Sequence, residues 1–272
     1  VDLLVGSEGT LALFTEIELR LEPTPAASAS LLGEFRSLDG AVRAAAEARK
    51  LGAGACELLD RTFLEVATSG GAVLPVAVGA EGVLLVKLEG ESMRDVGSRA
   101  RAIEQAFRRI GAAGVTMALD AGAERDLWEL RHAVSPILSR LDPSIKSMQF
   151  IEDSAVPPEH LADYVRGVRA VLERHKVKGV IFGHAGDAHI HVNPLIDVSQ
   201  PDWRAKLDGI LDGVVALTAS LGGTLTGEHG DGRLRTPLLA RVWTDAARER
   251  FSLVKRCFDP QGILNPGVKV PL

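Results

Sequence analysis

The chain lacks the features that mark several large classes of protein. It has two cysteines, Cys56 and Cys257, which lie far apart, so it has no disulfide framework and suits a reducing compartment. No apolar run approaches the roughly 20 residues that a membrane helix needs. Aromatic residues make up 4% of the chain, and 31 Lys and Arg against 36 Asp and Glu give a net charge of −5. This composition disfavours nucleic acid as a partner, because phosphate binding requires a basic surface.

The start of the chain has no initiator Met, basic leader or cleavage signal. Residues 1–5 predict a buried strand that begins abruptly, and residues 11–21 predict a second apolar strand. Pro23 then ends the pattern. We therefore expect a piece of a longer protein, in which residues 1–25 end one domain and residues 26–272 form another.

The rest of the chain alternates between the apolar spacing of strands and that of helices. The predicted strands are 31–35, 55–59, 82–89, 115–119, 146–156, 177–184 and 189–194. The predicted helices are 38–51, 61–66, 93–110, 121–141, 157–175, 203–221 and 244–258. No G-x-G-x-x-G follows a strand, so a dinucleotide fold is not indicated. Adjacent hairpin strands favour an α+β fold with a mostly antiparallel sheet, helices on one face and two ferredoxin-like halves.

Two glycine-rich segments carry the strongest chemical signal. They contain four of the seven histidines, namely His184, His189, His191 and His229. Imidazole suits Zn, Mn or Fe, and the neighbouring Glu228 adds the carboxylate of an open catalytic site. His189, His191 and Asn193 share one face of a predicted strand, so spacing alone leaves open which histidine is a ligand. The alternative is that these are ordinary polar residues at strand ends.

Three further residues are weaker candidates. Arg131 shares a helix face with Trp128, and by itself would be a surface arginine on a packed helix. Lys146 begins an apolar strand, where an edge charge is common. Asn265 lies in Leu-Asn-Pro-Gly and is by default a turn residue.

Several motifs resemble a known family. Gly-Ser-Glu-Gly-Thr-Leu at 6–11 resembles the end of the flavin-binding domain of FAD-linked oxidases of the vanillyl-alcohol-oxidase type. Segments 183–193, 227–230 and 258–267 resemble the C-terminal substrate and metal domain of D-2-hydroxyacid dehydrogenases in that superfamily. That group includes D-lactate and D-2-hydroxyglutarate dehydrogenases and the glycolate oxidase flavin subunit. Residues 150–159 are similar to large bacterial members fused to an iron–sulfur domain.

The resemblance implies an enzyme that oxidises a small D-2-hydroxy acid to the 2-oxo acid. FAD, bound mostly by a preceding domain, would accept the hydride, and a divalent metal (Zn, or Mn or Fe) would stabilise the alkoxide. The electrons would pass to an iron–sulfur domain or partner, or to a quinone. The resemblance further implies a cytoplasmic location, which is peripheral to the membrane if the electron acceptor is in the membrane.

The resemblance also implies roles for particular residues. The metal ligands are His184, His191 and Glu228. The catalytic and substrate-binding residues are His229 as the base, Arg131 for the carboxylate, Lys146 and Asn193. The flavin contacts are Ser7, Glu8, Gly9, Thr10 and Asn265. His189 stands where Asn is usual in the family, which makes it an extra ligand or a changed substrate contact.

Two other functions fit the same residues. A stand-alone metal-dependent hydrolase would use His184, His191 and Glu228 to activate water and would need no flavin. A non-catalytic module would bind metal or a hydroxy acid without chemistry. The motif at 6–11 and the abrupt first strand favour the oxidoreductase.

Overall fold

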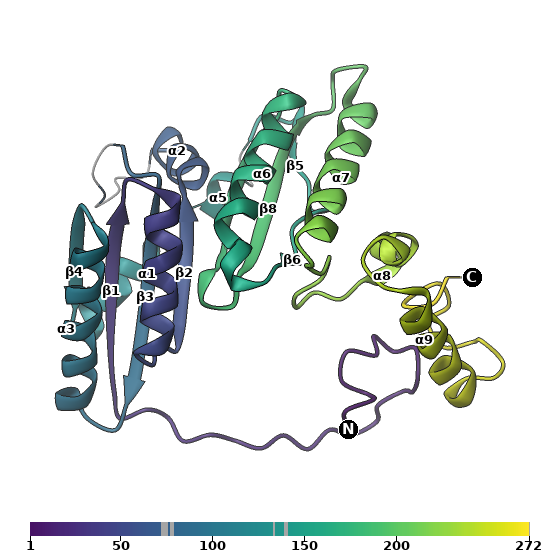
Figure 1. Ribbon diagram of the computed structural model, residues 1–272, viewed down its shortest axis with the longest axis horizontal. Coiled ribbons are helices and arrows are strands. Elements are labelled where there is room, and N and C mark those ends of the chain that lie inside the picture. The colour runs from purple at the N-terminus through teal and green to yellow at the C-terminus, as the bar shows by residue number, and fades with distance from the viewer. Residues whose placement is uncertain (72–75, 77–78, 133, 139–140, 272) are drawn as a thin grey trace.

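The centre of the molecule is one antiparallel sheet (Figure 1). The computed structural model describes residues 1–71, 76, 79–132, 134–138 and 141–271. The strands are β1 (Ala27–Phe35), β2 (Ala55–Asp60), β3 (Gly82–Gly90), β4 (Gly114–Ala118), β5 (Ile145–Ser147), β6 (Ser154–Ala155), β7 (Lys178–His184) and β8 (His189–Asp197). Their order is β4-β1-β3-β2-β7-β8-β5, and β6 also pairs with β8. The predicted α+β class and antiparallel pairing are confirmed.

Helices and short 3-10 turns connect the strands. The helices are α1 (Leu38–Lys50), α2 (Arg61–Ser69), α3 (Met93–Ile110), α4 (Ala121–His132), α5 (Val134–Leu138), α6 (Leu161–Arg174), α7 (Trp203–Ser220), α8 (Gly232–Arg235) and α9 (Asp245–Phe258). The 3-10 turns are η1 (Pro158–His160), η2 (Ala185–Asp187) and η3 (Thr236–Arg241). Helix α3 has its predicted bounds because Ser92 caps its first turn and Gly111 ends it in the left-handed conformation. Among the described residues, no helix is both long and apolar enough to cross a membrane.

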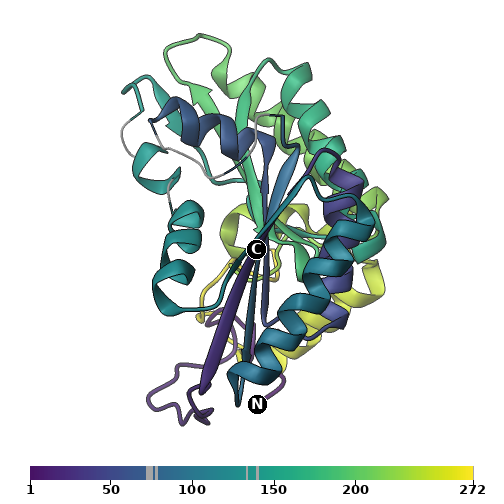
Figure 2. The same cartoon turned by 90° about the vertical axis from the view of Figure 1, so that its left-hand side faces the viewer.

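Helices cover both faces of the sheet, so the prediction of helices on one face was wrong (Figure 2). Leu58 belongs to the core under α1, α3, α6 and α7, whereas Leu59 belongs to the core under α2 and α4. The pairs Leu31–Leu32 and Leu84–Leu85 are divided between the two cores in the same way. A strand buried on both faces has a continuous apolar run instead of an alternating pattern.

The second half of the sheet departs from the prediction. The strand expected over 146–156 is two short strands, β5 and β6, with irregular chain between them. In the first half the order is β4-β1-β3-β2, but the second half pairs as β7-β8-β5 with β6 also on β8. Two ferredoxin-like halves are therefore not shown.

The strands predicted at 1–5 and 11–21 do not form. These residues are turn or irregular, and no strand pairs with them. Their apolar side chains are largely exposed, with Leu13 81% and Leu21 86% accessible. The alternating pattern of a strand needs a partner sheet, which this segment does not have in the structure.

A buried ion pair fixes the junction of the two halves, where β2 pairs with β7. Asp60 is fully buried at the end of β2 and also accepts a hydrogen bond from the backbone N–H of Thr62. Nε of Arg169 in α6 donates to Oδ2 of Asp60 at 2.7 Å, and Nη1 of the same arginine donates to Glu81. A buried carboxylate destabilises the fold unless a charged partner compensates for its loss of contact with water.

We predict that Arg169→Met lowers the free energy of unfolding by about 3–5 kcal/mol, because it leaves Asp60 buried without a countercharge. The matched control is Arg166→Met in the same helix, where the arginine pairs with Asp39 and Asp163 at the surface. The control should cost at most about 1 kcal/mol. Urea unfolding measures both, and equal losses would contradict a special dependence of Asp60 on Arg169.

Candidate metal centre

The β7–β8 hairpin brings three histidines together. Its register sets His184 opposite His189, and Phe182 opposite His191. Gly183 permits the two strands of the hairpin to approach closely, because a Cβ at that position would lie 2.4 Å from the carbonyl oxygen of His189. Ala188 adopts φ +52° in the turn between the strands, a left-handed conformation that favours glycine.

Two of these histidines are oriented by protein acceptors. Nδ1 of His184 lies 2.6 Å from Oε1 of Glu57, and Nδ1 of His191 lies 2.7 Å from the carbonyl oxygen of Glu152. An Nδ1–H that donates to such an acceptor leaves the lone pair on Nε2. The two Nε2 atoms face each other at 3.3 Å. The bond to Glu57 raises the pKa of His184, whereas burial lowers that of His191.

A buried carboxylate, Asp153, attaches the second glycine-rich segment to the hairpin. Its oxygens accept hydrogen bonds from His189 Nε2 at 2.8 Å, Thr226 Oγ1 at 2.5 Å, Glu228 N at 3.2 Å and His229 N at 2.9 Å. Burial acts to raise its pKa, but these bonds hold the pKa of Asp153 well below its usual range. As a result, Oε1 of Glu228 lies 3.4 Å from His191 Nε2 and 3.6 Å from His184 Nε2.

The donor set fits a divalent transition metal. Nε2 of His184, Nε2 of His191 and Oε1 of Glu228 are separated by 3.3–3.6 Å. Ligands about 2.0–2.1 Å from a tetrahedral ion are on the order of 3.3 Å apart. A carboxylate behind a histidine, as Glu57 lies behind His184, is the usual arrangement for an imidazole that binds metal. Two imidazoles and one carboxylate suit Zn, Mn or Fe.

Further ligand-type side chains lie within reach. The described residues form two overlapping groups, one of His184, His189, His191 and Glu228, and one of Asp153, His191, Glu228 and His229. His189 and Asp153 already bond each other, which leaves His184, His191, Glu228 and His229. Of these, His184, His191 and Glu228 place their Nε2 and Oε1 atoms within 3.3–3.6 Å of one another, and His184 and His229 do not belong to the same group.

The residues expected to bind or activate substrate lie around this set, with one exception below. The ring of His229 stacks on His191 at 5.4 Å, and its Nε2 lies 3.2 Å from Oε1 of Glu228. Nε of Arg131 donates to Oε2 of Glu57 at 3.0 Å, and its guanidinium lies over Phe182. Asn193 is buried two residues beyond His191, on the same face of β8.

Lys146 is the exception. It is exposed and pairs with Ile196, five residues along β8 from His191 and so roughly 16 Å away along the strand. Directly opposed residues project from the same face, and Ile196 belongs to the core on the face opposite Asn193. The structure therefore does not bring Lys146 to the histidines.

The expected flavin segment forms a compact unit with the C-terminal residues. The Glu8 carboxylate accepts hydrogen bonds from Asp231 N at 2.7 Å and Gly232 N at 2.8 Å, and pairs with Lys269. Nδ2 of Asn265 donates to the carbonyl oxygen of Glu8. Ser7 and Thr10 are buried, and Gly9 adopts φ +69°.

This unit adjoins the loop that carries Glu228 and His229, because a Cβ at Gly230 would lie 2.7 Å from Cδ of Glu8. The polar groups of Glu8 and Asn265 are engaged within the chain. The flavin contacts expected of Ser7, Glu8, Gly9, Thr10 and Asn265 therefore stay a prediction.

Several buried groups of the site were not predicted from the sequence. They are Glu57, Glu152, Asp153 and Arg235. Nη2 of Arg235 lies 2.5 Å from Oε1 of Glu152, and its Nη1 donates to the carbonyl oxygen of Gly230. The available signal was two consecutive acids, Glu152 and Asp153, within an otherwise apolar stretch, since a charge there must find a partner.

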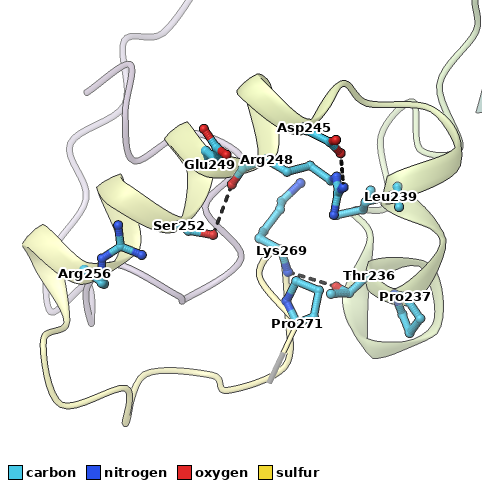
Figure 3. Close-up of a pocket in the computed structure, with 11 residues that line it drawn as sticks. Thr236, Pro237, Leu239, Asp245, Arg248, Glu249, Ser252, Arg256, Lys269 and Pro271 are labelled. Atoms are coloured by element: carbon cyan, nitrogen blue, oxygen red, sulfur yellow. Dashed lines mark hydrogen bonds and ion pairs between the residues drawn. The ribbon is translucent and has the colours of Figure 1, made fainter.

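A cavity of about 510 Å³ lies elsewhere, between η3, α9 and the C-terminal segment (Figure 3). Its lining includes Arg248, Glu249 and Lys269, and Arg248 pairs with Asp245 across one side. No residue of the histidine cluster lines it. The candidate metal centre therefore lies outside this cavity.

The fold and the cluster define an α+β domain with a candidate metal centre built from two histidines and a glutamate. The chain belongs to the family described as FAD linked oxidases, C-terminal domain, which it matches over residues 24–268.

Its relatives are named as oxidoreductases of 2-hydroxy acids. The glycolate oxidase subunit GlcD of Bacillus subtilis (strain 168) is 30% identical over 97% of this chain and 56% of that protein. The D-2-hydroxyglutarate dehydrogenase of Escherichia coli (strain K12) is 32% identical over 99% of this chain and 28% of that protein. The D-lactate dehydrogenase of Archaeoglobus fulgidus is 30% identical over 97% of this chain and 56% of that protein. The chain thus spans about half or less of each relative.

A solved structure shares the fold. The 4-ethylphenol oxidase from Gulosibacter chungangensis superposes with a TM-score of 0.68 at 17% identity, covering 93% of this chain and 55% of that chain.

We predict that Zn²⁺ binds to the purified chain and that His191→Ala lowers its affinity by more than about 100-fold, since a ligand is lost. The matched control is His160→Ala, which removes a histidine at the start of α6 whose side chain is 42% exposed. Calorimetric titration measures both variants. Equal affinity in the two would remove His191 from the ligand set and make His189 the candidate.

Proposed function

We propose that this chain is the substrate- and metal-binding part of an FAD-dependent enzyme that oxidises a small D-2-hydroxy acid to the 2-oxo acid. The observation that carries the proposal is the convergence of His184, His191 and Glu228 beside His229 and Arg131. The named substrates of the relatives, which are 2-hydroxy acids, support the same class. Residues 1–25 would end a preceding flavin-binding domain, and 26–272 would form the domain proposed here.

Two absent groups complete the proposed site. A divalent metal held by His184, His191 and Glu228 would supply Lewis-acid stabilisation of negative charge on the substrate hydroxyl oxygen. FAD, bound mainly by sequence outside this chain, would supply the hydride acceptor. The electrons would then pass to an iron–sulfur domain or partner, or to a quinone. The enzyme would be cytoplasmic, and it would lie at the membrane if its electron acceptor is there.

Arg131 is suited to hold the substrate carboxylate. Its Nε is bonded to Glu57 and its plane lies over Phe182, so the fork has a fixed orientation. A planar guanidinium binds a carboxylate through two parallel hydrogen bonds and so fixes the α-carbon. Asn193, on the same face as His191, would contact the substrate as well. Lys146 has no part in this proposal, because it lies on the opposite face.

His229 is suited to accept the hydroxyl proton at Nε2, which lies 3.2 Å from Oε1 of Glu228. Histidine is the side chain that most often acts as a general base, and it can take a proton from a group within hydrogen-bond reach. Loss of this proton and of the α-hydrogen, which leaves with its electron pair, converts the C–OH into a C=O. Both electrons thereby leave the substrate with the hydride.

We predict that Arg131→Lys raises KM for the hydroxy acid by about tenfold or more in the flavoprotein that contains this chain, with flavin content unchanged. An ammonium group is a point charge and cannot make the bidentate contact. Arg125→Lys, at an exposed position of the same helix, is the control. Steady-state kinetics with D-lactate and D-2-hydroxyglutarate test it, and an unchanged KM would return Arg131 to a structural role.

We predict that His229→Ala slows flavin reduction by about 10²–10⁴-fold, the usual effect of losing a positioned general base. Metal content should stay the same, because His229 is not assigned as a ligand. Stopped-flow absorbance and metal analysis on one sample test both statements. A wild-type rate would exclude His229 as the base, and metal loss would make it a ligand.

Ester hydrolysis by the metal-loaded chain without flavin would instead favour a hydrolase.

A further inference from the structure

We propose that Glu57 is a positioning residue that sets His184 and Arg131 in their places relative to each other. The inference rests on the function proposed above for the roles of those two residues. Its evidence is independent of that function, because it comes from the strand register and from the contacts of one buried carboxylate.

The location of Glu57 is unusual for a charged residue. It lies in the middle of β2, directly across from His184 of β7 in the strand register. Its side chain is buried, and it shares its face of β2 with Leu59, in the core that also contains residues of α4. A carboxylate in such a place is costly unless both oxygens have charged or hydrogen-bonding partners.

Each oxygen of Glu57 has one partner. Oε1 lies 2.6 Å from Nδ1 of His184, and Oε2 accepts a hydrogen bond from Nε of Arg131 at 3.0 Å. One partner comes from strand β7 and the other from helix α4, which are far apart in the chain. Glu57 therefore joins two elements that would otherwise be positioned separately.

These contacts orient the working atoms of both partners. An Nδ1–H of His184 that donates to Glu57 leaves Nε2 facing Nε2 of His191 at 3.3 Å. The guanidinium of Arg131 lies 4.5 Å from the ring centroid of Phe182, and that ring lies 5.2 Å from the His191 ring. The proposed carboxylate-binding group is thus held one aromatic ring away from a proposed metal ligand.

Glutamine cannot replace Glu57 at this position, although it has the same size. Nε of Arg131 is always a donor, and Nδ1 of His184 is a donor when its Nε2 binds a metal, whereas an amide offers one acceptor oxygen and one donor NH₂. One of the two contacts must then be lost and replaced by two facing donors. Glu57→Gln therefore removes the bridging function with little change in volume.

Zn²⁺ titration of the purified chain tests the His184 side of the bridge. Glu57→Gln should lower Zn²⁺ affinity by about 10–100-fold, the usual effect of mutating the carboxylate behind a ligating histidine. The control is Glu124→Gln. Glu124 lies in α4 and is also a buried carboxylate, which accepts hydrogen bonds from Ser28 and Ser30. The Zn²⁺ affinity of this control variant should equal that of the wild type. Equal affinity of Glu57→Gln and wild type would overturn the inference. Failure of the wild type to bind Zn²⁺ would instead overturn the proposed function.

Kinetics of the flavoprotein that contains this chain test the Arg131 side. At saturating Zn²⁺, Glu57→Gln should raise KM for the hydroxy acid, and should raise it less when Arg131 is already Met, because both changes remove the contact between Glu57 and Arg131. Additive effects of the two substitutions on KM would contradict the bridge.

A wild-type measurement keeps the inference testable if Glu57→Gln does not fold. Nitrogen-15 NMR of the histidine side chains in the Zn²⁺-bound chain should show His184 protonated at Nδ1 with Nε2 bound to the metal. Metal binding through Nδ1 would overturn the inference.

Discussion

Four hydrogen bonds to the buried carboxylate of Asp153 hold the two histidine-bearing, glycine-rich segments of this protein together. One bond comes from His189 on the hairpin, and three come from the loop that carries Glu228 and His229. Bonds to a charged acceptor are worth about 1.5–3 kcal/mol each, which is enough to order a short glycine-rich loop. Gly227 permits this contact, since a Cβ there would lie 2.6 Å from the His189 ring.

The same arrangement recurs behind each histidine of the hairpin. His184 has Glu57, His191 has the backbone carbonyl of Glu152, and His189 has Asp153 as its acceptor. When one ring nitrogen is hydrogen-bonded in this way, the imidazole ring cannot rotate freely and its tautomer is fixed. The sheet therefore supplies the position of each ring and the buried acceptors supply its orientation, so the three rings are held in place by the protein itself.

Part of this structure could be predicted from the sequence. Helix α3 was predicted from its amphipathic spacing, and its local capping residues give it the predicted bounds. The clustering of histidines was predicted because four of them lie in two glycine-rich segments. The second helical layer was missed because the adjacent hairpin strands were taken to favour helices on one face, although the continuous apolar run of β3 is the pattern of a strand buried on both faces. Lys146 was assigned to the site from the resemblance alone, and in the structure it pairs with Ile196, five residues along β8 from His191. Glu57 and Asp153 were missed because their partners lie 127 and 36 residues away, which no local pattern indicates.

The central claim is that His184, His191 and Glu228 form one metal centre. X-ray absorption at the zinc edge of the Zn²⁺-loaded chain tests it most directly. The account predicts two imidazole ligands, with nitrogen and oxygen donors at about 2.0–2.1 Å and no sulfur, and one imidazole fewer in a variant that lacks His191. Sulfur at about 2.3 Å, or a wild-type spectrum without imidazole scattering, would place the ion elsewhere and contradict the claim.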